Sequence, residues 1–172
     1  MPAEEDSKYR MELRPMTPQD WDEVSRIYRE GIETRLATFE TQVPLWEKWD
    51  AGHLKTGRLI AEQAGKVLGW AALSPISTRS VYRGVAEVSI YVSADARQQG
   101  VGRALLLRLI AISEEAQIWT LQASIFRHNH PSISLHEKCG FRVVGHREKI
   151  AQLDDEWYDT TIMERRSTLV GV

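Results

Sequence analysis

A carboxylate, Glu87, interrupts an apolar run over 85–92 whose alternation predicts a buried strand. Successive side chains of a strand point to opposite faces, so Glu87 shares its face with Ser89 and Tyr91, and that face is polar. A carboxylate there can accept a proton from a ligand, and burial can raise its pKa toward the working range. We take Glu87 as the candidate general base; the alternative is a structural carboxylate that pairs with a nearby arginine.

Two glycines spaced one residue apart, Gly100 and Gly102, follow this strand and open a leucine-rich helix expected to run to Glu115. The first N–H groups of a helix have no partner within it, and the helix dipole adds partial positive charge there. Without side chains at these positions, an anion can approach the backbone closely. Gly-x-Gly is also common in tight turns, but its place between a strand and a helix favours a phosphate cradle over 98–103.

A helix expected over 129–139 carries polar side chains at steps of three, four and three residues, which fall on one face: Asn129, Ser132, His136 and Cys139. His136 titrates near neutral pH and can donate a proton; the alternative is a solvent-facing helix histidine. Cys139 is expected to be buried packing rather than a nucleophile. No cluster has the spacing of metal ligands, so no metal is expected.

The loop before the Glu87 strand offers two arginines, Arg79 and Arg83, as clamps for a ligand carboxylate. Guanidinium groups match carboxylates through paired hydrogen bonds. The alternatives are a solvated loop or pairing with Glu87. An irregular segment over 32–43 has no clean period and can line a pocket. The residues expected on the substrate side are Thr34, Phe39, Arg79, Tyr82 and Arg83.

The framework that must position these side chains begins with a strand, two helices and hairpins without helical crossovers. Gly31 is expected to interrupt the first helix. The pattern predicts one α/β domain of the α+β type over 9–166, with a mixed sheet of about seven strands flanked by about four helices. A disordered lead-in over 1–8 and a frayed tail over 167–172 are expected to flank it. The expected strands cover 9–14, 58–63, 66–73, 85–93, 118–125, 141–151 and 156–164, and the expected helices 18–30, 44–55, 100–115 and 129–139.

Composition places the chain among globular proteins, because 42% of its 172 residues are hydrophobic and 27% are charged. A formal net charge of −2 offers no basic excess for binding nucleic acid. The one cysteine excludes an internal disulfide and suits a reducing compartment. No segment has the pattern of a signal peptide or the length of a membrane span. We therefore expect a cytoplasmic protein whose partners include neither nucleic acid nor a membrane.

The pattern Arg97-x-x-Gly100-x-Gly102 after a strand resembles the acetyl-CoA pyrophosphate motif of the GNAT superfamily of N-acetyltransferases. The segment 132–141 resembles the late helix of that family and the strand after it. The similarity covers roughly 10–166 and is closest to the phosphinothricin and methionine sulfoximine N-acetyltransferase branch. The segments that carry the branch resemblance are 32–34, 37–40, 74–75, 82–83 and 86–92.

The resemblance implies direct transfer of an acetyl group from acetyl-CoA to the α-amino group of a small amino acid or analogue, in a ternary complex and in a homodimer. It implies that backbone N–H groups over 98–103 wrap the pyrophosphate and that 90–92 hydrogen-bond the pantetheine arm like an added strand. His136 stands where many members have a tyrosine that protonates the departing CoA thiolate. The implied cofactor-binding residues are Ile90, Tyr91, Val92, Gln98, Gln99, Gly100, Val101, Gly102, Arg103, Asn129 and Ser132.

Three sites depart from the branch pattern and leave the acceptor amine open: Ser77, the pair at 84–85 and the pair at 35–36. Whether Glu87 acts directly or through a water also stays open. Two other functions compete with acetylation of a small amine. One is acetylation of a protein N-terminus or lysine, which needs an open peptide groove. The other is a module that binds CoA without catalysis.

Overall fold

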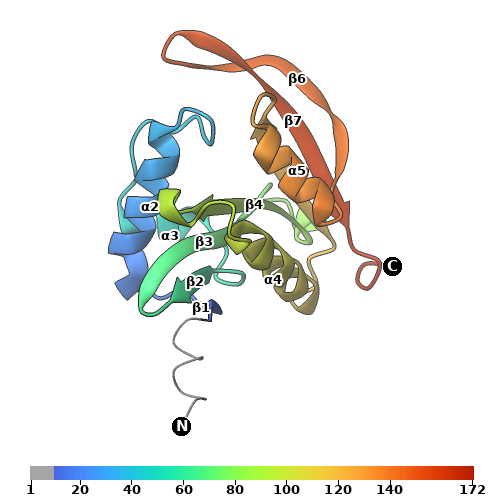
Figure 1. The fold of residues 1–172 in the computed structure, drawn as a ribbon. Coiled ribbons are helices and arrows are strands. Elements are labelled where there is room, and N and C mark those ends of the chain that lie inside the picture. Colours follow the sequence, from blue (N-terminus) through green and yellow to red (C-terminus); the bar gives the residue numbers. More distant parts are fainter. Residues whose placement is uncertain (1–9) are drawn as a thin grey trace.

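The computed structural model describes residues 10–172. One seven-stranded sheet, with strand order β1-β2-β3-β4-β5-β7-β6, forms the centre of the molecule (Figure 1). The predicted order of elements and the predicted fold class are both confirmed. The strands are β1 (Glu12–Pro15), β2 (Leu59–Gln63), β3 (Lys66–Pro75), β4 (Val85–Val92), β5 (Thr120–Phe126), β6 (Arg142–Leu153) and β7 (Glu156–Arg166). The α-helices are α2 (Trp21–Glu33), α3 (Trp46–Gly52), α4 (Val101–Glu115) and α5 (His130–Lys138), with short 3-10 turns at η1 (Pro18–Asp20), η2 (Ser80–Tyr82) and η3 (Ala94–Ala96).

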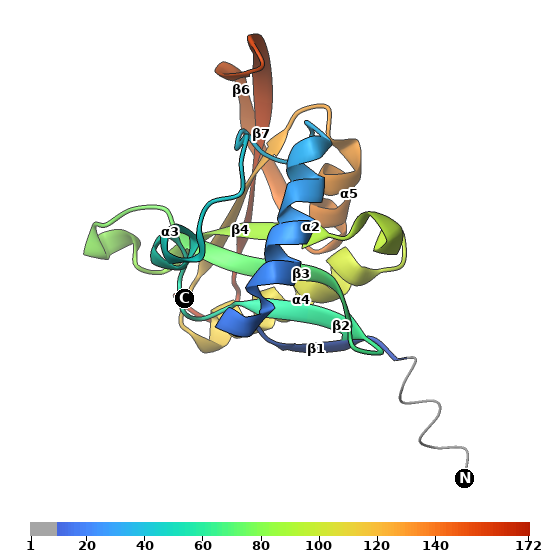
Figure 2. The same cartoon turned by 90° about the vertical axis from the view of Figure 1, so that its left-hand side faces the viewer.

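The helices form two layers, with α2 and α3 on one face of the sheet and α4 and α5 on the other (Figures 1 and 2). On the α4 side, Val88 of β4 and Leu121 of β5 pack with the leucines of α4 in the larger core cluster. On the α2 side, Tyr91 of β4 packs with Trp70 and the apolar face of α2. Alternation therefore sends Glu87, Ser89 and Tyr91 toward the α2 side, and the prediction that these three residues share a face is confirmed.

A divergence between the two central strands creates room within the sheet. β4 and β5 are the parallel neighbours of an otherwise antiparallel sheet, and they pair only from Val85↔Thr120 to Glu87↔Gln122. Both strands continue beyond these residues, β4 to Val92 and β5 to Phe126. The main chain of β4 past Glu87 thus keeps its pairing with β3 and has an edge toward β5 that no strand covers.

Two predicted helix boundaries were wrong. Helix α2 does not break at Gly31 but continues to Glu33. A Cβ at Gly31 would lie 2.7 Å from the ring of Tyr91, so the glycine serves a close approach of helix and strand rather than a break. Helix α3 is shorter than the predicted 44–55, because His53 is already extended, with φ −120° and ψ 146°.

The chain ends with a long hairpin, β6–β7, which arches beyond the rest of the sheet (Figure 1). The tail over 167–172 was expected to fray, but it folds back onto the domain. Ser167 is buried and its Oγ donates a hydrogen bond to Glu114, while Arg166 donates to the carbonyl oxygens of Val170 and Gly171. The predicted lead-in over 1–8 lies outside the described residues. Within 10–172, no helix combines the length and the hydropathy that a membrane crossing requires.

Candidate active site

A cavity of about 340 Å³ opens where β4 and β5 diverge. It passes between the two layers, because its walls come from α2 and the segment 37–40 on one side and from α5 on the other. Glu87 and His136, the two catalytic candidates, both line it. The cavity therefore joins residues that the sequence places far apart.

The α5 half of the cavity has a free strand edge and a capped helix. Ile90 lines it from the uncovered edge of β4, and Asn129 and Ser132 line it from the start of α5. Asn129 Oδ1 accepts a hydrogen bond from the Ser132 amide at 3.3 Å, and its Nδ2 donates to the Leu36 carbonyl at 3.0 Å. Asn129 thus ties the segment before Phe39 to α5.

The turn between β4 and α4 contains two residues in the left-handed region and leads directly into the start of α4. Gln98 and Gly100 both have positive φ, at 61° and 82°, and Gly100 is the N-cap of α4. Gly102 allows α4 and α5 to approach, because a Cβ there would lie 3.2 Å from the side chain of Leu135. The N–H groups of the first turn of α4 have no partner within the helix and point toward its positive end. These residues extend from the end of β4 rather than lining the cavity itself.

Glu87 is half-buried, and among the described residues only one of its two carboxylate oxygens accepts a hydrogen bond. Its Oε2 accepts a hydrogen bond from Gln122 Nε2 at 3.1 Å, across the last paired rung of β4 and β5. Neither Arg79 nor Arg83 pairs with it among residues 10–172, so the expected alternative of an arginine partner for this carboxylate is wrong. A carboxylate held in place at the mouth of the strand divergence is available to a ligand in the cavity.

His136 is buried, with 4% of its surface exposed, so the solvent-facing alternative is wrong. Its Nδ1 lies 2.7 Å from the carbonyl oxygen of Ser132, and its ring packs edge-on against Phe141. Burial lowers the pKa of His136 below its usual range, against a weaker raising effect of that hydrogen bond. A neutral ring donates from Nδ1 to Ser132 and presents an unprotonated Nε2, which does not favour a role as proton donor.

The α2 half of the cavity is built of hydroxyls, aromatic rings and two carboxylates. Tyr28 packs edge-on against Tyr91 at 4.8 Å, and burial raises the pKa of each phenol. Phe39, as predicted, forms a wall here and packs on Phe126 at 4.6 Å. Glu40 is the second carboxylate, and no Lys or Arg lines the described cavity. The half that faces away from α5 therefore combines acidic and hydroxyl groups with an aromatic wall.

Four of the five residues predicted on the substrate side do not line this cavity. Thr34 Oγ1 donates to the carbonyl of Gly31 at 2.6 Å at the end of α2. Arg79 lies over the ring of Tyr82 at 5.7 Å, and Arg83 lies over Trp119 at 5.5 Å. All three residues of that loop are exposed, as in the solvated-loop alternative. Long flexible cations outside a core follow local aromatic partners, which spacing along the chain does not reveal.

Sequence reasoning missed several residues that line the cavity. The alternation of β5 could have pointed to Ser124 and Phe126, because both share the face of Gln122. The segment predicted to line a pocket contains Glu40, which was not singled out. Thr160 of β7 gave no signal, because its position depends on β7 being inserted between β5 and β6.

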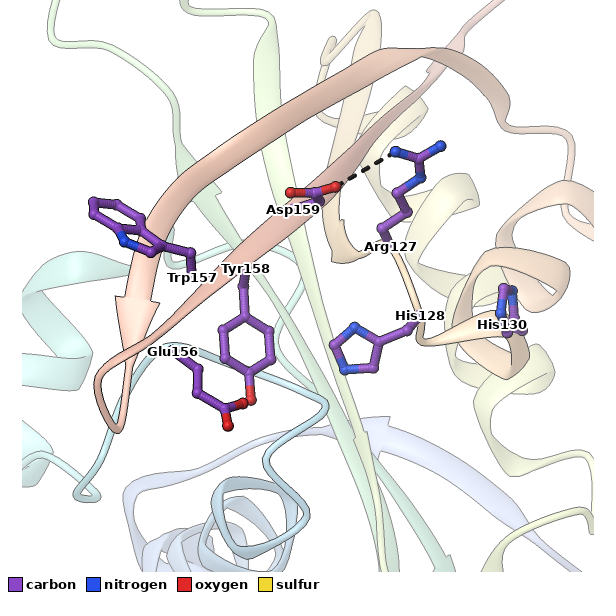
Figure 3. A pocket seen from close by; sticks show the side chains of 7 residues that line it. All are labelled: Arg127, His128, His130, Glu156, Trp157, Tyr158 and Asp159. Atoms are coloured by element: carbon purple, nitrogen blue, oxygen red, sulfur yellow. Dashed lines mark hydrogen bonds and ion pairs between the residues drawn. The ribbon is translucent and has the colours of Figure 1, made fainter.

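A second, shallower hollow of about 540 Å³ lies outside this cavity, between β7 and the loop before α5. Figure 3 shows Arg127 paired with Asp159, at 3.4 Å, and the ring of His128 beside Tyr158. Tyr158 also packs on Phe126 at 5.0 Å, so aromatic side chains separate the two spaces. Although the hollow is larger, we take the cavity as the site, because it alone contains Glu87 and His136. No group of three or more His, Cys, Asp or Glu side chains in the described chain can hold a metal ion.

Comparison with known proteins agrees with this geometry. The Acetyltransferase (GNAT) family matches residues 21–141. Phosphinothricin N-acetyltransferase of Alcaligenes faecalis is 35% identical over 159 residues, which are 89% of this chain and 81% of that protein. L-methionine sulfoximine/L-methionine sulfone acetyltransferase of Pseudomonas paraeruginosa is 30% identical over 158 residues, 88% of this chain and 92% of that protein. The crystal structure of a GNAT superfamily phosphinothricin acetyltransferase from Sinorhizobium meliloti in complex with AcCoA superposes with a TM-score of 0.84 at 28% identity, covering 94% of this chain and 90% of that one. The chain therefore belongs to the acetyltransferase (GNAT) family and is an N-acetyltransferase that uses acetyl-CoA.

Proposed function

We propose that this enzyme acetylates the α-amino group of a small amino acid or amino acid analogue, by direct transfer in a ternary complex. The proposal rests on one observation: the free edge of β4 and the α2 half that contains Glu87 belong to the same cavity. An acetyl donor on the α5 side and an amine acceptor on the α2 side can then meet where β4 and β5 diverge. The names of the relatives, phosphinothricin and methionine sulfoximine acetyltransferases, support an amino acid analogue as acceptor.

The described residues fit acetyl-CoA. We propose that the uncovered main chain of 90–92 hydrogen-bonds the pantetheine arm, with Asn129 and Ser132 on the opposite wall. The backbone over 98–103 would bind the pyrophosphate, because Gln98 and Gly100 are left-handed and Gly100 is the N-cap of α4, whose first N–H groups have no partner within the helix. Bound acetyl-CoA supplies an acetyl group activated as a thioester.

Glu87 is the proposed general base. An amine is protonated at neutral pH and must lose a proton before it can form the new bond to carbon. Gln122 fixes one carboxylate oxygen of Glu87, which leaves the other free to accept that proton directly or through a water. His136 stays a proposed catalytic residue on the opposite wall. Its lowered pKa leaves Nε2 unprotonated, so His136 could protonate the departing CoA thiolate only after it has received the proton that Glu87 takes from the amine.

The acceptor carboxylate is not assigned to Arg79 or Arg83, because neither lines the cavity. We also propose a homodimer in the cytoplasm. The hairpin β6–β7 exposes Val144 and Trp157, at 50% and 57% of their surfaces, which suits an interface between two copies. The one cysteine is buried and needs no oxidising compartment.

An amine panel with acetyl-CoA, read by release of free thiol, tests the proposal. The panel contains methionine sulfone, methionine sulfoximine, phosphinothricin, simple amines without a carboxylate, and peptides with free N-termini or lysines. Turnover of the amino acid analogues with KM below that of the simple amines is the expected result. Turnover of peptides alone would replace the proposal by protein acetylation. Thermal stabilisation by acetyl-CoA without turnover of any amine would instead indicate a binding module.

A further inference from the structure

A buried hydroxyl without a partner lines the α2 half of the cavity. Thr160 of β7 is 2% exposed, and its Oγ1 has no hydrogen-bond partner within the described residues. Buried hydroxyls are almost always bonded, because an unsatisfied one costs about 1–3 kcal/mol. An orphan hydroxyl on a cavity wall is therefore a group that a ligand can satisfy.

The next residue shows that the orphan is specific to this position. Thr161 is also buried, at 1% exposure, but it points to the other face of β7, and its Oγ1 lies 3.0 Å from Nδ1 of His146. The two threonines share a strand, a residue type and the same burial. They differ in that the one facing the cavity lacks a partner. Thr161 is thus a matched internal control.

The register of the sheet sets the span between Thr160 and Glu87. Gln122 pairs with Glu87, and Phe126 pairs with Thr160, so both pairs share the face toward α2. Gln122 and Phe126 are separated by four residues of extended strand, which is about 13 Å. Glu87 and Thr160 lie on the strands on opposite sides of β5, about 4.8 Å from it each, so their main chains are roughly 16 Å apart. A small amino acid side chain reaches roughly 6 Å beyond its amine, at bond lengths near 1.5 Å. With a hydrogen bond of about 3 Å at each end, such a molecule spans about 12 Å, and the side chain of Glu87, which extends about 4 Å from its Cα, covers the rest of the distance.

The wall between these ends is apolar. Phe39 and Phe126 pack against each other and cover the stretch next to Thr160. An acceptor that suits this half has its ammonium group at the Glu87 end, an apolar stem along the rings and an oxygen at the far end.

We propose that Thr160 determines acceptor specificity, by donating a hydrogen bond to an oxygen at the far end of the acceptor side chain. The chemical class is an α-amino acid whose apolar stem ends in a sulfone, sulfoximine or phosphinate oxygen. This inference rests on the proposed function and adds which end group the site selects. A site built to bond a polar group discriminates strongly against an analogue that lacks it, because its own polar group is then left unpaired.

Methionine and methionine sulfone form the test pair, because they differ only in the oxygens on sulfur. Initial rates with acetyl-CoA are measured by free thiol for wild type, Thr160→Val, Thr160→Ser and Thr161→Val. We expect wild type to prefer the sulfone. Thr160→Val should lower the ratio of kcat/KM for sulfone to that for methionine about 3- to 10-fold, through KM rather than kcat. Thr160→Ser keeps the hydroxyl and should keep the ratio, as should Thr161→Val.

The outcomes separate this inference from the proposed function. A wild type that acetylates neither amino acid overturns the proposed function, and the inference falls with it. A wild type that acetylates both without preferring the sulfone overturns only the inference. So does an unchanged ratio in Thr160→Val, or an equal fall of the ratio in Thr161→Val. Thermal melting shows that the variants are folded; Thr160→Val should melt no lower than wild type, because it removes an unsatisfied hydroxyl.

Discussion

Replacing Gly31 with alanine tests how closely α2 approaches the strand that carries the catalytic candidate. Gly31 lies within α2, two residues from its end, and a Cβ there would be 2.7 Å from two carbons of the Tyr91 ring. That ring cannot retreat freely, because it stacks on Trp70 at 4.7 Å and packs on Tyr28. The new methyl group must therefore displace a packed ring or the helix itself.

Two opposing effects decide whether Gly31→Ala raises or lowers the free energy of unfolding. Alanine is better than glycine in a helix by about 0.8–1.0 kcal/mol. Overpacking a well-filled core costs about 1–3 kcal/mol. We expect overpacking to win, so that Gly31→Ala lowers the free energy of unfolding by up to about 2 kcal/mol.

Gly52→Ala supplies the control. Gly52 is also helical, at the end of α3, but a Cβ there would meet nothing within 4 Å. Urea unfolding followed by circular dichroism should show Gly52→Ala up to about 1 kcal/mol more stable than wild type. The difference between the two variants isolates the contact with Tyr91. Because Tyr91 lines the cavity, Gly31→Ala should also raise KM for the acceptor. If Gly31→Ala is as stable as Gly52→Ala and keeps wild-type KM, the close approach of α2 and β4 is refuted.

Two further predictions concern the α5 half of the cavity. Burial lowers the pKa of His136 from an unfolded value near 6.5, so its contribution to stability is complete above that pH and is lost as pH falls through the folded pKa. The free energy of unfolding should therefore fall from pH 7 to pH 5, by at most about 1.4 kcal/mol per pH unit from this group. The fall should be smaller in His136→Gln, and equal slopes in the two proteins would contradict a buried neutral ring. Burial also lowers the pKa of His53, which accounts for the slope that remains in the variant. Gly100→Val should raise KM for acetyl-CoA, because Gly100 has φ 82° at the N-cap of α4. The matched control is Gly65→Val, at φ 77° in the turn between β2 and β3, where a Cβ would meet no other atom. It should lose similar stability but bind acetyl-CoA normally, and equal losses of acetyl-CoA binding in both variants would refute the anion site.

The fold followed from the sequence because its signals are local. Hydrophobic period and turn residues indicated every strand and α-helix in the described chain, and the alternation of β4 put Glu87 on the correct face. Gly31 was misjudged because a glycine that breaks a helix and one that admits a neighbouring ring look alike in sequence. The difference lies in Tyr91, which is distant along the chain.

The site was predicted unevenly for the same reason. Asn129, Ser132 and His136 share one helix face, so their spacing brought them together correctly. Residues whose place depends on strand order had no such signal. Thr160 reaches the cavity only because β7 lies between β5 and β6. The arginines of the loop before β4 were predicted from their chemistry alone, and that loop points them to local aromatic rings instead.

The central claim is that Glu87 accepts the proton of the acceptor amine, and Glu87→Gln tests it most directly. Glutamine keeps the size of the side chain and can still accept the hydrogen bond from Gln122. Glu40→Gln removes the same charge from another wall of the same cavity and serves as the control. With methionine sulfone as acceptor, we expect Glu87→Gln to lower kcat about 100-fold or more with acetyl-CoA binding unchanged, and Glu40→Gln to change mainly KM for the acceptor. A Glu87→Gln enzyme with wild-type kcat would contradict the account.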